Sequence, residues 1–180
     1  MNLLSGSDLP LLPVQLVLTS LLTDIPCITI ATDNVGTEEL ERPSKFNVHS
    51  LMFISMFLGS ITALFEIIYY VIIRNQPTGI EQTGMYLFLT LSALVIIFSV
   101  RNKGHFWHAP KLSNAMIASF AIVAAISIGI IYLTITKSLF SFTALSVGIM
   151  SITIVLTAVH ISFLDTIKTW FYKSKIGSNF

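Results

Sequence analysis

The sequence predicts an all-α fold: a polytopic membrane bundle of five transmembrane helices, with the N-terminus outside and the C-terminus inside. Three observations lead to this prediction. Apolar residues make up 54% of the 180 residues and charged residues only 11%, whereas an ordinary globular protein has about 25% charged residues. The mean hydropathy is +0.82. Five stretches are long and apolar enough to cross roughly 30 Å of hydrocarbon.

The charge balance and the cysteine count exclude several other classes of protein. Ten Lys and Arg against nine Asp and Glu leave a net charge of +1, so we expect no nucleic-acid partner and no acidic disorder. Cys27 is the only cysteine, which excludes an intrachain disulfide and a cysteine-based zinc cluster. Membrane lipid is therefore the expected surrounding of the chain.

Each expected span is an apolar stretch that ends at a polar loop. The first span contains Pro13, Asp24 and Pro26, and the second contains Glu66 as its sole charged residue. The third is short, and the fourth and fifth are separated by a tight turn around Lys137, with His160 near the end of the fifth. Together they form one transmembrane domain covering residues 1–180, with spans at about 9–31, 51–73, 84–100, 113–136 and 139–164.

The basic residues predict the orientation of the bundle, because Lys and Arg accumulate in loops on the inner side of a membrane. Arg74 and Lys137 fall in loops on one side. The other eight basic residues fall on the side that holds the C-terminus, namely Arg42, Lys45, Arg101, Lys103, Lys111, Lys168, Lys173 and Lys175.

Small residues recur at four-residue spacing within three of the spans, a pattern typical of closely packed membrane helices. The pattern predicts that these positions are helix contacts. The positions are Gly59 and Ala63, then Ala121, Ala125 and Gly129, and finally Ala144 and Gly148.

Asp24 requires the most explanation, because a carboxylate at the centre of a span costs about 2.5–3.5 kcal/mol on insertion scales. Pro26 lacks an N–H, so the carbonyl four residues before it loses its helical partner. A freed carbonyl beside hydroxyls and a carboxylate can hold a hard cation. We therefore predict an ion path along the helix face that carries Ser20, Thr23, Asp24 and Cys27 at positions i, i+3, i+4 and i+7.

Asp24 also has a structural alternative: it could pair with a base to hold two helices together, but no Lys or Arg lies mid-span in this chain. The other polar residues in or near the spans have simpler explanations. Glu66 is either a second ion-path residue or a protonated side chain bonded to a neighbouring helix. His160 is expected to be an imidazole that packs in the bundle or faces the membrane interface. His105 and His108 lie three residues apart in a loop, a weak signal for metal binding.

Two runs in the first span, Leu12–Leu16 and Leu22–Pro26, resemble the sixth transmembrane helix of the P-type cation-transporting ATPases. Ala31–Val35 and then Glu41–Pro43 resemble the segment after that helix in the magnesium-transporting branch. Two further segments resemble the opening of the family's eighth helix and the connector before its ninth, at Gln82–Gly84 and Val100–Trp107. The resemblance identifies the chain with helices six to ten of such a pump.

The resemblance implies a set of cation ligands. Asp24 corresponds to the aspartate of the family's transport site, with Thr23 at a hydroxyl position beside it. Ser20 falls where calcium-pump and magnesium-type patterns commonly have Asn, so one carbonyl ligand is replaced by a hydroxyl. Glu66 falls in the seventh helix, near an acidic residue of magnesium-type relatives. The family topology also gives an outside start and an inside C-terminus, in agreement with the charge pattern.

The family's catalytic motifs are absent from this sequence. Neither the phosphorylated DKTGT motif nor the TGES loop occurs, and the longest loop, about 15 residues, is too short for a nucleotide-binding domain. We therefore expect no ATPase activity from this chain alone and no bound cofactor. The transported cation, magnesium being favoured, would depend on ATP only through a separate catalytic half. The chain would be a truncated product, one half of a split pump, or a fragment.

Two other functions compete with this interpretation. The chain could be a stand-alone remnant that acts as a structural or regulatory membrane protein and moves no ion. It could also be a small secondary transporter or channel that uses Asp24 and Glu66 by itself, but such a protein should show internal repeats or a paired polar helix, and the sequence shows neither. In each case we expect a multi-pass protein of the plasma membrane.

Overall fold

The computed structural model describes residues 9–34, 48–101 and 110–173. These residues are mostly helical and contain no strand, and five of the helices are long and apolar enough to cross a membrane. The predicted all-α bundle of five membrane helices is therefore confirmed. The helices are α1 (Pro13–Thr29), the short η1 (Ile30–Thr32), α3 (Val48–Ile73), α4 (Thr78–Val100), α5 (Asn114–Tyr132), α6 (Thr134–Phe140) and α7 (Val147–Lys173).

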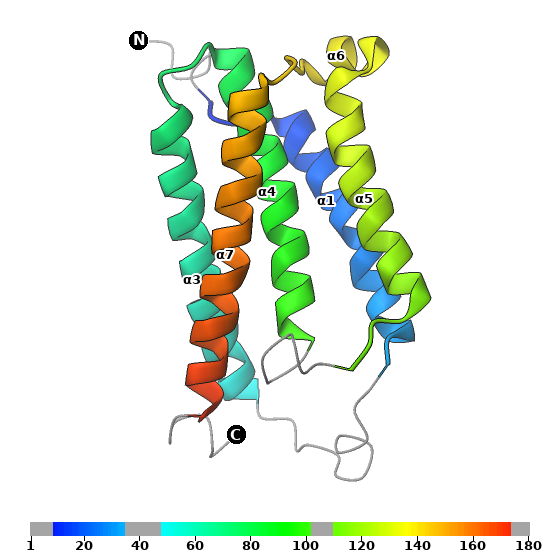
Figure 1. Ribbon diagram of the computed structural model, residues 1–180, viewed down its shortest axis with the longest axis vertical. Coiled ribbons are helices and arrows are strands. Elements are labelled where there is room, and N and C mark those ends of the chain that lie inside the picture. Colours follow the sequence, from blue (N-terminus) through cyan, green and yellow to red (C-terminus); the bar gives the residue numbers. More distant parts are fainter. Residues whose placement is uncertain (1–8, 35–47, 102–109, 174–180) are drawn as a thin grey trace.

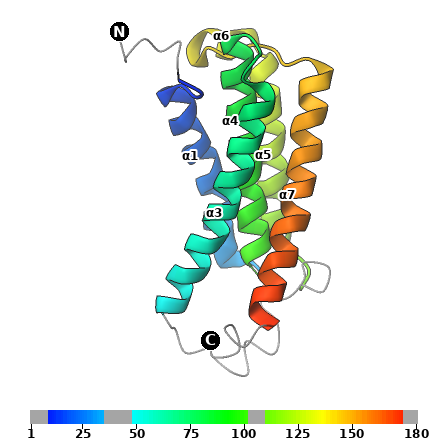
Figure 2. The same ribbon diagram turned by 90° about the vertical axis from the view of Figure 1, so that its left-hand side faces the viewer.

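Helix α4 is the centre of the bundle (Figure 1). It packs against α1, α3, α5 and α7, whereas α1 otherwise packs on α5, and α3 on α7. Eleven of the 23 residues of α4 are buried, a larger share than in any other long helix of the described residues. The view turned by 90° shows α3 and α7 side by side (Figure 2), and Phe53 and Phe57 of α3 lie against Phe171 of α7 near the end of the bundle that holds the C-terminus. The outer helices therefore form two pairs, one on each side of α4.

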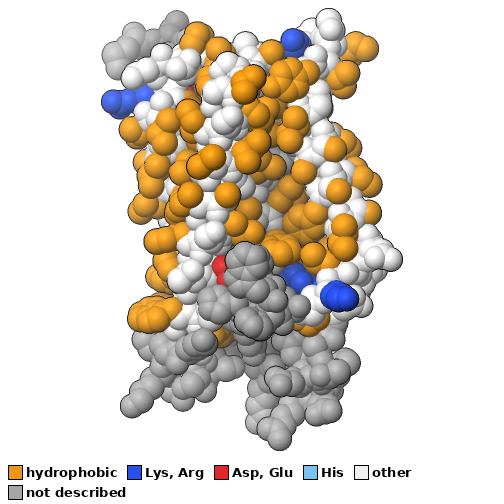
Figure 3. All heavy atoms as spheres, in the orientation of Figure 1, with side chains coloured by type: hydrophobic (Ala, Val, Ile, Leu, Met, Phe, Trp, Pro, Cys, Tyr) orange, Lys and Arg blue, Asp and Glu red, His pale blue; other side chains and the backbone are white. Residues whose placement is uncertain are grey.

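The surface of the bundle matches a position within a membrane. On the face shown in Figure 3, hydrophobic side chains cover the middle, and Lys and Arg side chains lie near the two ends. Large apolar side chains such as Val17, Ile67 and Val155 are exposed on the outside of three different helices. The direction in which the bundle crosses the membrane stays a prediction from the basic residues.

The last membrane helix begins and ends later than the predicted span at 139–164. Helix α6 ends at Phe140, its C-cap Ser141 has a left-handed backbone with φ of 55°, and α7 begins only at Val147. Helix α7 continues to Lys173 because Asp165 and Lys168 pair with each other inside the bundle. From hydropathy alone, those two charged residues mark the start of a polar tail, and for this reason the predicted span ends at 164.

Hydroxyl side chains link the helices through the apolar interior. Hydrocarbon offers no hydrogen-bond partner, so polar side chains in a bundle bond to one another or to their own backbone. Such links between membrane helices contribute about 0.6 kcal/mol each on average. The linked pairs, with the distance between their polar atoms, are Thr19–Thr90 (3.1 Å), Thr29–Ser119 (2.9 Å), Tyr69–Thr153 (2.7 Å) and Thr62–His160 (3.2 Å).

Gly84 brings α4 close to α3. A Cβ atom at this position would lie 2.9 Å from the Tyr69 hydroxyl oxygen and 3.2 Å from the Ile73 Cδ1 atom. Tyr69, Ile73 and the neighbouring Phe88 and Phe65 are buried together in this contact. Gly84 therefore allows the aromatic side chain of Tyr69 to lie against α4.

The prediction that the small-residue faces are helix contacts is wrong within the described residues. A Cβ atom at Gly59 or Gly129 would meet nothing within 4 Å. The other small residues of this set are all exposed on the outside of the chain, namely Ala63, Ala121, Ala125, Ala144 and Gly148. Spacing alone identifies a smooth helix face, but it does not say which face turns inward.

The contact at Gly84 leads to a stability prediction. In Gly84→Ala, the new methyl group collides with Tyr69, and overpacking of this kind costs about 1–3 kcal/mol. We expect a lower melting temperature for the purified chain in detergent. Gly129→Ala is the matched control, since it adds the same methyl group to a helix with open space around it. Equal melting temperatures for the two variants would contradict the proposed role of Gly84.

Candidate functional site

The candidate site lies on α1, and the sequence explains how this helix forms. Pro13 begins the helix at the first turn, where no N–H is needed. The side chain of Gln15 accepts a hydrogen bond from the backbone N–H of Leu12 at 3.2 Å and so caps that turn. Pro26 lies inside the helix, so the carbonyl of Leu22 has no helical N–H partner.

The predicted ion-path residues lie on α1, and most of them face away from the rest of the chain. Ser20, Asp24 and Cys27 are exposed, while Thr23 is half-buried. The buried residues of α1 lie on the side that packs against α4 and α5, and they include Thr19, Leu22 and Pro26. The face predicted from the sequence therefore exists, and it is open on the outside of the bundle.

The hydroxyls on this face bond to the backbone of their own helix. Ser20 donates to the Leu16 carbonyl at 3.2 Å, and Thr23 lies within hydrogen-bond distance of the Thr19 and Ser20 carbonyls. The two ion pairs within the described ranges use other aspartates and leave Asp24 out. No three His, Cys, Asp or Glu residues of the described part gather where they could hold a metal ion. The described residues by themselves therefore form no complete metal site.

The other candidates lie apart from this face or outside the described ranges. Glu66 is half-buried on α3, which packs on α4 and α7 rather than on the α1 side of the bundle. His160 is fully buried between Phe65 and Phe88, with its Nε2 atom bonded to Thr62. It is packed, as predicted. His105 and His108 lie outside the described residues.

A buried ionic network at the end of α1 was not recognised from the sequence. The Asp33 Oδ2 atom accepts a hydrogen bond from Arg101 Nε at 2.7 Å, and its Oδ1 atom accepts one from the Ser113 N–H at 3.0 Å. The two side chains are only 10% and 6% exposed. Asp33 thereby connects the end of α1 to the end of α4 and the start of α5.

The same interactions set the charge state of Asp33. Burial by itself would raise the pKa of Asp33, but the hydrogen bonds from the Ser113 N–H and the Arg101 side chain outweigh it. The pKa of Asp33 therefore lies below its usual value. At neutral pH the carboxylate is charged and both of its hydrogen bonds are made.

A second buried charge pair lies in α7. The ammonium group of Lys168 donates to Asp165 Oδ1 at 2.9 Å and to the Ser99 carbonyl at the end of α4 at 2.7 Å. Lys168 is only 2% exposed. The i, i+3 spacing of Asp165 and Lys168 could have indicated an ion pair on one helix face. In the sequence, however, the two residues follow an apolar run and resemble the start of a polar C-terminal tail. The pair ties α7 to α4.

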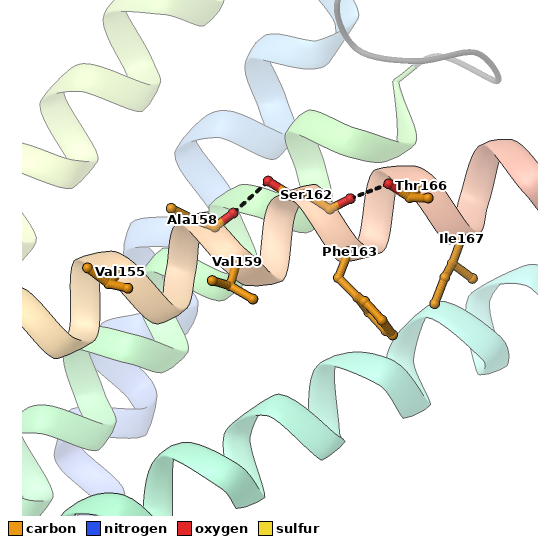
Figure 4. A pocket seen from close by; sticks show the side chains of 7 residues that line it. All are labelled: Val155, Ala158, Val159, Ser162, Phe163, Thr166 and Ile167. Carbon is orange, nitrogen blue, oxygen red and sulfur yellow. Dashed lines mark hydrogen bonds between the residues drawn. The ribbon is translucent and has the colours of Figure 1, made fainter.

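A groove runs along α7, and none of the residues that line it is ionisable. It is lined by Val155, Ala158, Val159, Ser162, Phe163, Thr166 and Ile167. Figure 4 shows Phe163 and Ile167 pointing toward α3. The hydroxyls of Ser162 and Thr166 donate to carbonyls one turn earlier. The groove is therefore apolar and cannot extend the ion path.

Comparison with known proteins identifies the family. Residues 8–170 match the model described as "Cation transporting ATPase, C-terminus", so the chain belongs to the family formed by the C-terminal membrane region of P-type cation-transporting ATPases. With its five apolar helices, it is an integral multi-pass membrane protein. The family predicted from the first span is thereby confirmed.

Individual relatives point to one branch of that family. The chain is 29% identical over 102 residues to the "Magnesium-transporting ATPase, P-type 1" of Escherichia coli strain K12 and to the protein of the same name in Salmonella typhimurium strain LT2. Each match covers 53% of this chain and 11% of the relative. The chain therefore corresponds to a small part of these relatives.

The Asp33 network leads to a prediction about pH. A carboxylate whose pKa is lowered in the folded protein stabilises it fully above its unfolded pKa of about 3.9, and that stability is lost as the pH falls through the lower folded pKa. We expect Asp33→Asn to cost about 1.5–3 kcal/mol at pH 7, the contribution of hydrogen bonds to a charged group.

Melting temperatures of the purified chain and the Asp33→Asn variant, measured in detergent from pH 7 down to pH 3, test this expectation. The gap between the two proteins should narrow as the solution becomes more acidic. A gap that stays constant over this range would show that the charge of Asp33 does not stabilise the fold.

Proposed function

We propose that this chain is the membrane-embedded C-terminal part of a P-type cation-transporting ATPase, and that it contributes Asp24, Thr23 and Ser20 to the path of the transported cation. One observation carries the proposal. The acidic face of α1 is turned outward, while the opposite face packs on α4 and α5. Because an unpaired carboxylate is costly within a membrane, such a face needs a polar partner beyond the described residues.

The proposed ligands favour a hard divalent cation. Carboxylate, hydroxyl and carbonyl oxygens bind calcium and magnesium ions, and magnesium usually keeps several waters and takes one or two carboxylates. The names of the two relatives favour magnesium. Asp24 would supply the charge, and the freed carbonyl before Pro26 would supply a neutral oxygen. Glu66 is a weaker candidate, since it lies on α3.

The proposed partner is the catalytic part of the same kind of pump, which would bind ATP and become phosphorylated. It would also supply the helices that cover the outward face of α1 and complete the cation site. On this proposal the chain has no ATPase activity by itself. It lies in the plasma membrane, surrounded by lipid, and works only in the assembled pump.

A second function is favoured by the bonding of the hydroxyls. Ser20 and Thr23 donate to their own backbone, as hydroxyls do in helices without a ligand. On this alternative the chain is a structural or regulatory membrane protein that binds other helices and moves no ion. Asp24 would then pair with a base on a partner helix.

Replacement of Asp24 separates the two functions. Asp24→Asn keeps the shape and removes the charge, and two unit charges 4 Å apart attract by about 4 kcal/mol at an effective dielectric of 20. A loss of about 3 kcal/mol corresponds to roughly 100-fold weaker cation binding. The chain is reunited with its catalytic half, and assembly and ion-stimulated phosphorylation are measured for both versions.

If the first function is correct, Asp24→Asn assembles normally and loses its ion dependence. Glu66→Gln is the comparison variant, and we expect a smaller effect. The chain without its catalytic half should form no phosphoenzyme under the same conditions. Unchanged ion dependence in Asp24→Asn would remove this residue from the transport path, and equal damage to assembly and transport would favour the structural alternative.

The proposed orientation has its own test. Single cysteines are placed at Ser44, Thr78 and Ser174 in a Cys27→Ser background, and intact cells are treated with an impermeant thiol reagent. We expect labelling at position 78 only, because the basic loops are retained inside. Labelling at position 44 from outside the cell would reverse the predicted orientation.

A further inference from the structure

We propose that Asp33 is a positioning residue for the candidate ion path. Its carboxylate holds α1 at one rotation about its own axis, so that Asp24 is turned away from α4 and α5. This inference rests on the proposed function, since the direction of Asp24 matters only if Asp24 binds the cation.

The position of Asp33 suits this role. It directly follows η1, which continues α1, and it lies nine residues after Asp24, a rise of about 14 Å along a helix. One carboxylate oxygen bonds to Arg101 at the end of α4, and the other bonds to the N–H of Ser113, the N-cap residue of α5. A single side chain therefore joins α1 to the two helices on which it packs.

The groups that hold Asp33 are themselves held. Arg101 also donates to the Pro110 carbonyl at 2.9 Å, so its guanidinium is bonded in two directions. Asn34, the next residue after Asp33, donates to the Lys111 carbonyl at 2.8 Å. The segment before α5 is thus bound by both Asp33 and Asn34, the two residues that follow η1.

The opposite end of α1 is anchored as well. The side-chain amide of Gln15 donates to the Phe140 carbonyl at 3.0 Å, and that of Gln82 on α4 donates to the Leu9 carbonyl at 2.9 Å. Successive residues of a helix are about 100° apart around its axis, so a slip of one residue would turn Asp24 toward a neighbouring helix. Anchors at both ends prevent such a slip, and Asp33 is the anchor on the Asp24 side.

Cys27 is a built-in reporter of this rotation. It is the only cysteine of the chain, it is exposed, and it lies three residues after Asp24 on the same face. A nitroxide spin label on Cys27 is followed by electron paramagnetic resonance in the full chain, reconstituted in lipid nanodiscs. Asp33→Ala should shift the spectrum toward a second, less mobile component with lower access to dissolved oxygen.

Asp165→Ala is the matched control. It removes a carboxylate from the other buried ion pair of the described residues, on α7, and it should lower the melting temperature while leaving the Cys27 spectrum unchanged. If Asp33→Ala does not fold, Asp33→Asn carries the test, because it keeps an acceptor for the Ser113 N–H. An unchanged spectrum in the folded Asp33 variant, or the same shift in Asp165→Ala, would overturn the proposal.

A double variant tests whether Asp33 and Arg101 act together. If they do, Asp33→Asn combined with Arg101→Gln should shift the spectrum no further than the larger single shift. Shifts that add would show that the two residues act separately, which would also overturn the proposal.

The assembled pump separates this inference from the proposed function. Asp33→Asn should raise the cation concentration needed for half-maximal phosphorylation while the amount of assembled pump stays the same. If the Cys27 spectrum shifts but Asp24→Asn leaves ion dependence intact, the positioning role stands and the proposed function fails. If Asp24→Asn abolishes ion dependence but no Asp33 variant shifts the spectrum, only the positioning role fails.

Discussion

The absence of water in the hydrocarbon is the constraint on which this structure depends. Every backbone group must be satisfied inside a helix, and each polar side chain must find a partner in its own helix or the next. The bundle meets this demand with hydroxyls, as in the contact between Tyr69 and Thr153. Its charges are handled by pairing near the helix ends, as at Asp33 and Asp165. Asp24 and Glu66 are the exceptions, since neither has an ion-pair partner among the described residues, and the proposed ion path begins from Asp24.

The constraint also explains why α4 is central. This helix has apolar or hydroxyl side chains around most of its circumference, among them Tyr86, Thr90 and Ser92, all fully buried. It can therefore be surrounded by four helices without leaving a charge unpaired. Its last turn is held from two sides, by Arg101 toward α1 and α5, and by Lys168 toward α7. The acidic face of α1 is positioned by this scaffold rather than by a partner of its own.

Much of the fold could be predicted because long apolar runs have few alternatives in a chain of this composition. The end of α7 could not, since Asp165 and Lys168 lose their polar character only when the fold pairs them. The prediction that the small residues are helix contacts was wrong for the described residues. The spacing of Gly59 and Ala63 would suit any closely packed helix, but it does not indicate whether a helix lies beside them. Asp24 was chosen as a candidate from the cost of a carboxylate within a span and from its motif, and its role stays a prediction. The contribution of Asp33 needed the structure, because Arg101 and Ser113 lie 68 and 80 residues further along the chain.

The packing of α1 has a consequence for the order of biosynthesis. Helix α1 is translated first among the described helices, yet the helices that it contacts, α4 and α5, come later. The start of α5 follows the end of α1 by about 85 residues, which ribosomes add in roughly 4 to 17 s at 5–20 residues per second. During that interval α1 carries its carboxylate without the neighbours that later fix its rotation. The newly made helix must therefore be sheltered by the insertion machinery, or by other helices already in the membrane, until the bundle closes around α4.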